Sequence, residues 1–148
     1  MFETLLEFTE SKSIIKPHVF VLLEAALKAS CNTEYNDNVR EISMHFVECL
    51  ADKNAKLISK NAQALDMVVR AAFQICAEDE KDFEDSYDNP IERSLDMLYN
   101  YAAECSSSRI FPVVMKYIHS CGVSNNPLER KAAIRVLGHI SDTDTCME

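Results

Sequence analysis

The chain has 148 residues, with two glycines, four prolines, no tryptophan and a formal net charge of −9. Because strand-rich folds need frequent turn glycines, this composition favours an all-α fold, and an apolar fraction of 47% argues against general disorder. The negative charge disfavours direct binding to nucleic acids or to anionic membranes, since both require a positive surface. No apolar run approaches the roughly 20 residues that a membrane-spanning helix needs.

Apolar side chains recur with helical spacing in seven stretches of the chain. The first predicted helix covers residues 2–10. The second begins near Pro17, which suits a first helical turn because its missing N–H would be unpaired there anyway. The third begins at Val39 and is expected to end at Asp52-Lys53-Asn54. The fourth has the most regular apolar face, formed by Leu65, Val68, Val69, Ala72, Ile75 and Cys76.

Residues 78–88 separate the fourth helix from the fifth and are strongly acidic. They contain seven acids and one lysine, so this segment carries six of the nine net negative charges of the chain. Like charges at this density repel one another and resist compact packing, which predicts a solvated loop. The seven acids are Glu78, Asp79, Glu80, Asp82, Glu84, Asp85 and Asp88.

Three further helices are predicted after the acidic segment. The fifth runs from Pro90 to about Cys105, with Asn89 as its N-cap and Glu92 in the position of a capping box. The sixth ends near Gly122, and its apolar face contains Ile110, Val113, Val114, Tyr117 and Ile118. The seventh begins at Asn126-Pro127, and its apolar face contains Ala133, Val136, Leu137 and Ile140.

A short sequence motif recurs at the start of three of these helices. It reads Asn89-Pro90-Ile91-Glu92-Arg93, then Asn126-Pro127-Leu128-Glu129-Arg130, and in a looser form Asn36-Asp37-Asn38-Val39-Arg40. A recurring supersecondary unit predicts a stacked array of helix pairs rather than a closed globule. Arg40 and Arg93 lie 53 residues apart, whereas Arg93 and Arg130 lie 37 apart, and the acidic segment accounts for most of the difference.

A turn Asp or Asn, a branched apolar residue and an Arg at the start of the second helix of a pair are typical of HEAT repeats. The sequence therefore predicts an all-α superhelix of HEAT repeats, with about seven helices in antiparallel pairs. Residues 1–10 are the second helix of an incomplete pair, repeats cover 13–54, 56–106 and 108–142, and 143–148 are a tail. In such repeats the turn Asp and the Arg tend to link neighbouring units, so the candidates for a structural ladder are Asp37, Arg40, Arg93 and Arg130.

Beyond the repeat itself, nearly the whole chain resembles a central piece of the importin-β superfamily of nuclear transport receptors (karyopherins). It is most similar to the importin-4 and importin-5 group. Three stretches carry the resemblance: Ile15-Lys16-Pro17-His18 before an apolar helix, Asn38 to Ser43, and the acidic segment with Ile91 to Asp96, Ile110 to Met115 and Pro127 to Ala133. Receptors of this family are many repeats long, so the resemblance implies that the chain is an excerpt.

The resemblance also implies a function. Importin-β receptors shuttle between cytoplasm and nucleus, carry cargo past the nucleoporins of the pore, and release that cargo when Ran-GTP binds. In this family an acidic loop of a central repeat contacts the basic surface of the Ran GTPase, which is the role implied for the acids of residues 78–88. Basic cargo proteins would lie on the concave face, where the candidate acids are Glu41, Glu48, Asp96 and Glu104.

No arrangement of residues in the sequence indicates an enzyme, a cofactor or a metal site. The four histidines form no HExxH motif, and the six cysteines form no CxxC pair, which predicts reduced core thiols in a cytosolic or nuclear protein. The chain also lacks a P-loop, a GxGxxG motif and a nucleophile elbow. Two alternatives stay open: another HEAT-repeat scaffold, such as a phosphatase regulatory subunit or an assembly factor, and a helical hydrolase with an unrecognised site.

Overall fold

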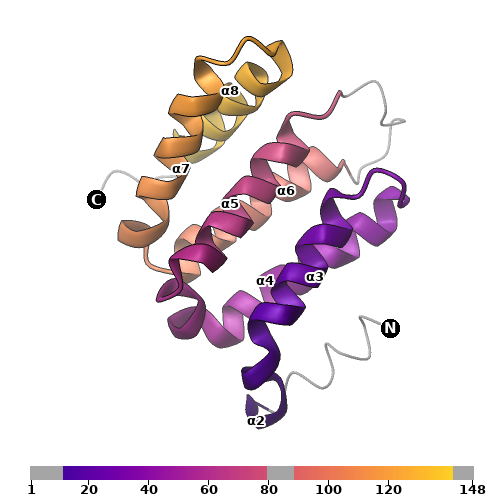
Figure 1. Ribbon diagram of the computed structural model, residues 1–148, viewed down its shortest axis with the longest axis vertical. Coiled ribbons are helices and arrows are strands. Elements are labelled where there is room, and N and C mark those ends of the chain that lie inside the picture. The colour runs from indigo at the N-terminus through magenta and orange to yellow at the C-terminus, as the bar shows by residue number, and fades with distance from the viewer. Residues whose placement is uncertain (1–11, 80–88, 142–148) are drawn as a thin grey trace.

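A computed structural model describes residues 12–79 and 89–141, and all regular secondary structure in these ranges is helical (Figure 1). The short α2 (Lys12–Ile15) and the 3₁₀ turn η1 (Lys16–His18) lead into six longer helices. These are α3 (Val19–Cys31), α4 (Asp37–Ser59), α5 (Ala62–Cys76), α6 (Pro90–Glu104), α7 (Ser107–Gly122) and α8 (Pro127–Ser141). The helix expected over residues 2–10 and the tail at 143–148 lie outside the described residues.

The six longer helices form three contacting pairs: α3 with α4, α5 with α6, and α7 with α8. Figure 1 shows these pairs side by side, with α5 and α6 in the middle. Because α3 also packs against α5, and α4 against α6, the first two pairs are stacked like with like. The prediction of an all-α fold built from helix pairs is confirmed.

The third pair sits differently on the second pair than the second does on the first. If the third pair repeated the stacking of the second pair on the first, α8 would pack against α6. Of the two helices of the second pair, however, α8 contacts mainly α5 and only lightly α6. Arg135 of α8 is part of this contact, since its guanidinium donates a hydrogen bond of 2.7 Å to the carbonyl oxygen of Cys76 at the end of α5. The spacing of the repeated sequence motif therefore predicts the number of helix pairs but not how the pairs pack on one another.

An asparagine begins four of the six longer helices. The side-chain oxygens of Asn36, Asn61, Asn89 and Asn126 accept hydrogen bonds of 2.9–3.0 Å from backbone N–H groups in the first turns of α4, α5, α6 and α8. Each such cap satisfies a donor that the helix itself leaves unpaired, and typically contributes about 1 kcal/mol. In the structure, each copy of the recurring sequence motif therefore supplies a helix N-cap.

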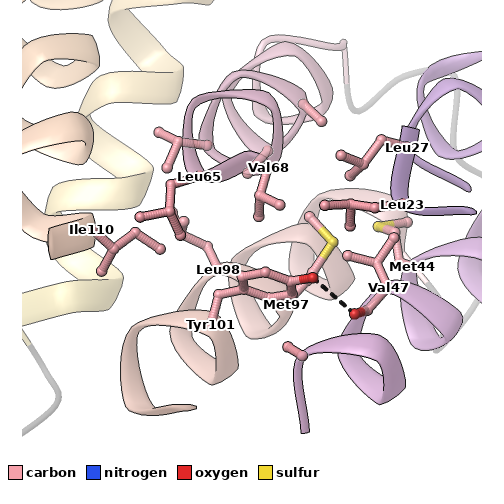
Figure 2. Packing of buried hydrophobic residues seen from close by; sticks show 14 of the residues in the cluster. Leu23, Leu27, Met44, Val47, Leu65, Val68, Met97, Leu98, Tyr101 and Ile110 are labelled. Carbon is pink, nitrogen blue, oxygen red and sulfur yellow. Dashed lines mark hydrogen bonds between the residues drawn. The ribbon is translucent and has the colours of Figure 1, made fainter. Parts of the chain in front are cut away.

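The core lies between the two helices of each pair and between the pairs. Figure 2 shows Met97 and Tyr101 of α6 lying between Met44 and Val47 of α4 and the side chains of α5. The Tyr101 hydroxyl donates a hydrogen bond of 3.0 Å to the carbonyl oxygen of Val47, which satisfies a polar group that is fully buried. Burial raises the pKa of Tyr101 well above its ordinary value. This bond joins the first and second pairs at their centre.

One sequence prediction about the helices holds in part, and two are wrong. The regular helix stops at Asn54, where φ is −129° and ψ is 23°, as the polar run Asp52-Lys53-Asn54 predicts, but a second helical stretch follows this kink and α4 ends at Ser59. Ile58 in that second stretch is fully buried. Val39 and Leu137, expected on apolar faces, are 37% and 47% exposed, because other residues of α4 and α8 form the buried faces.

Candidate protein-binding surfaces

The first two acids of the acidic segment follow α5 directly, and one of them is part of the fold. Glu78 accepts a hydrogen bond of 2.5 Å from the Arg40 guanidinium, and its side chain is only 15% exposed. Asp79 is half-buried. The expectation of a solvated loop is therefore wrong for Glu78, because the buried Arg40 requires an anionic partner. Glu80, Asp82, Glu84, Asp85 and Asp88 lie outside the described residues.

Arg40 joins three segments of the chain at the same end of the helices. It is 2% exposed, and its Nε donates a hydrogen bond of 2.8 Å to the carbonyl oxygen of Ser30 near the end of α3. Its guanidinium also lies 3.8 Å from the Asp37 carboxylate, one turn earlier in α4. Together with the Glu78 contact, these bonds link the first pair to the second, so Arg40 and Glu78 form a structural clamp.

Arg93 links the same two pairs from a different place. Its guanidinium donates hydrogen bonds of 2.6 Å to Glu48 and 3.1 Å to Nδ1 of His45, both on α4. Nε2 of the same ring lies 3.8 Å from the Cys49 sulfur. Asn100 adds a bond of 3.3 Å to Glu48. Glu48 therefore joins α4 to α6 and is not an open surface acid.

The other predicted site residues do not form one cluster. Arg130 donates a hydrogen bond of 2.7 Å to the carbonyl oxygen of Ser124 in its own turn, so this contact is local, unlike those of Arg40 and Arg93. Asp96 is 3.8 Å from Nε2 of His139 on α8. Glu41 is half-buried on α4, and Glu104 is exposed near the end of α6. Of the four acids predicted for the concave face, two are therefore engaged with neighbouring helices.

Sequence reasoning missed His45 and Asn100, which complete the contacts of Glu48. It also missed the partner of Arg40, because Glu78 lies 38 residues further along the chain. The spacing of His45, Glu48 and Cys49 places them on one helix face and could have indicated a polar cluster there. Nothing in the sequence indicated that the cluster would receive Arg93 from α6.

Of the five described cysteines, Cys76 and Cys105 are buried and the other three are half-buried. Burial raises the pKa of all five, to about 11 for Cys76 and Cys105. A thiol with a raised pKa stays protonated at neutral pH and is a weak nucleophile. Cys76 also shares a hydrogen bond of 3.3 Å with the Ser94 hydroxyl, which fixes it between α5 and α6. These thiols therefore belong to the packing of the helices.

Within the described ranges, no group of three or more His, Cys, Asp or Glu residues is placed to hold a metal ion. In the same ranges, no helix is both long and apolar enough to cross a membrane. Apolar side chains are exposed on the third pair, where Phe111, Met115, Ile134 and Leu137 are 40–71% exposed. Next to them, a cavity of about 260 Å³ between α6, α7 and α8 is lined mainly by apolar residues such as Leu98, Phe111 and Ile140.

Comparisons with known proteins add no family to this picture: no family model matches the chain, and no curated protein is similar to it.

Proposed function

We propose that this chain is a segment of a nuclear import receptor of the importin-β superfamily, which binds proteins through a HEAT-repeat solenoid and performs no catalysis. The observation that carries the proposal is the position of the acidic segment. Residues 78–88, with a net charge of −6, join the two helices of one pair, α5 and α6. In the family that the sequence resembles, an acidic loop at such a place contacts Ran.

The contacts of Glu78 exclude it from the acids that we propose for contact with Ran. Glu78 is held by Arg40 and is largely buried, so it anchors the start of the segment. Asp79 is half-buried beside it, so the acids that we propose for a basic partner are those of residues 80–88. Clustered carboxylates raise the association rate of a basic partner and make its binding sensitive to salt.

The same proposal assigns basic cargo to the acids of the second helices of the pairs. Glu48 is engaged by Arg93, and Asp96 lies 3.8 Å from His139 on α8, which leaves Glu41 and Glu104 as the candidate cargo contacts. Contacts with nucleoporins and shuttling between cytoplasm and nucleus would belong to the complete receptor. Support for a binding role also comes from the four exposed large apolar side chains of the third pair, since apolar residues exposed to solvent are candidates for contact with a partner.

The test is binding of the chain to Ran loaded with GTP or with GDP, measured by interferometry at low salt. We expect binding to Ran-GTP only, and at least tenfold weaker binding by the variant Asp82→Asn/Glu84→Gln/Asp85→Asn. The matched control is Glu24→Gln/Glu34→Gln/Glu92→Gln, which removes three exposed acids elsewhere and should bind as the wild type does. Equal binding to both nucleotide states, or none, would instead favour another helical-repeat scaffold.

A further inference from the structure

A hollow at the kink of α4 gathers positive charge on this acidic protein. It has a volume of about 580 Å³, and four lysines line it: Lys16, Lys53, Lys56 and Lys60. Asp52 is the one acid among the described residues that line the hollow. Four of the 15 basic residues of the chain thus meet at one place, although the chain as a whole carries a net charge of −9.

The fold creates this hollow by bringing two distant segments together. Lys16 belongs to the 3₁₀ turn η1, whereas the other three lysines belong to the end of α4 and the turn that follows it. The kink at Asn54 changes the direction of α4 between Lys53 and Lys56, and the Asn54 side chain donates a hydrogen bond of 3.1 Å to the carbonyl oxygen of Leu50. That bond satisfies a carbonyl next to the kink and helps to fix the shape of the hollow.

Within residues 12–79 and 89–141, these four lysines form no ion pair that would stabilise the fold. Lys28 and Lys116 lie within 4.0 Å of Glu24 and Asp66, but none of the four hollow lysines has such a partner in the described part of the chain. Arg109 adds a fifth positive charge nearby, since it donates a hydrogen bond of 3.1 Å to the carbonyl oxygen of Ser59, next to Lys60. Unpaired like charges held together repel one another, so a bound anion would relieve that repulsion.

We propose that this lysine hollow is a docking site for a short acidic peptide segment of a partner protein. The charges come from two elements and succeed one another along α4, so they suit several carboxylates along a chain better than a single phosphate. Ala55 and Leu57 also line the hollow and offer apolar contact to a peptide. A long polyanion such as a nucleic acid would extend beyond the hollow onto a surface that is negative overall, which disfavours it.

The test uses a fluorescein-labelled hexapeptide of alternating Asp and Glu, titrated with the complete chain and followed by fluorescence anisotropy. We expect saturable binding that weakens steeply as salt is raised. The variant Lys53→Gln/Lys56→Gln should bind at least tenfold more weakly. The control Lys28→Gln/Lys116→Gln removes the same charge from two lysines that are 75% and 72% exposed elsewhere, and should stay within twofold of the wild type.

Equal weakening by both variants would overturn the proposal, because the peptide would then respond only to net charge. The absence of saturable binding by the wild-type chain at low salt would overturn it too. Parallel titrations with a duplex DNA oligonucleotide and with vesicles containing phosphatidylserine cover the other polyanions, and tighter binding to either would replace the peptide as the ligand. All four substituted lysines are exposed, and circular dichroism of each variant confirms that its helices are intact.

Discussion

The charged side chains near the two ends of α5 lie in opposite environments. Where α5 ends, Arg40 and Glu78 are largely buried, and they bind each other and the end of α3. Where α5 begins, the lysines of the α4 kink are exposed and form no ion pair among the described residues. At both ends, charged residues from distant parts of the sequence lie close together. Within the described ranges, only where α5 ends do these residues form ion pairs and hydrogen bonds that join the helices. The charges that the fold does not use are the ones available to a partner.

The largest expected effect comes from removing Arg40. Arg40→Met removes the guanidinium that binds both Glu78 and the Ser30 carbonyl oxygen, and breaking a buried pair in this way typically costs about 3–5 kcal/mol. The control Arg130→Met removes an exposed arginine with a local contact and should change the free energy of unfolding by less than about 0.5 kcal/mol. Urea unfolding of both variants measures the difference, and similar losses for the two would contradict the clamp.

A second, smaller effect should appear at alkaline pH at the buried end of α5. Burial raises the pKa of Cys76 to about 11, above its value in the unfolded chain. The contribution of the protonated thiol to stability is therefore complete below about pH 8.5 and is lost as the pH rises toward 11, by roughly 2–3 kcal/mol.

The measurement compares urea unfolding of the wild type with that of Cys76→Ser at several pH values between 8 and 11. Because serine does not titrate in this range, the stability of the variant should fall less steeply with pH. Cys121→Ser, at a half-buried position, is the control and should leave the slope closer to that of the wild type. Parallel curves for the wild type and Cys76→Ser would show that this thiol does not titrate as the buried site predicts.

The smallest expected effect is at the kink of α4. Lys53→Gln/Lys56→Gln removes two exposed and unpaired charges, so the free energy of unfolding should change by less than about 0.5 kcal/mol. The loss of peptide binding would then be separable from any loss of stability. A decrease of 1 kcal/mol or more in urea unfolding would mean that these lysines stabilise the fold, and the contrast between the two ends of α5 would disappear.

Local features of the fold could be predicted from the sequence because they depend on neighbours in the chain. The asparagine caps at Asn89 and Asn126 follow from the residue type and its place before a helix. All six apolar positions predicted for the fourth helix, from Leu65 to Cys76, are buried in α5. The sequence predicts the break at Asn54 but not the helical stretch beyond it, because a polar run at a kink and one at a helix end look alike until the burial of Ile58 is known.

The amino-acid sequence is enough to predict that this protein is helical, where most of its helices begin, and that its negative charge is concentrated in residues 78–88. Spacing and composition are sufficient for these conclusions because helix caps and apolar faces act over a few residues. The packing of the helices was needed to show that Glu78 belongs to the fold, that α8 packs on α5, and that Lys16 lies with the lysines of α4. These contacts join residues about 40 or more positions apart, and packing of the helix pairs, which no local pattern specifies, is what brings them together.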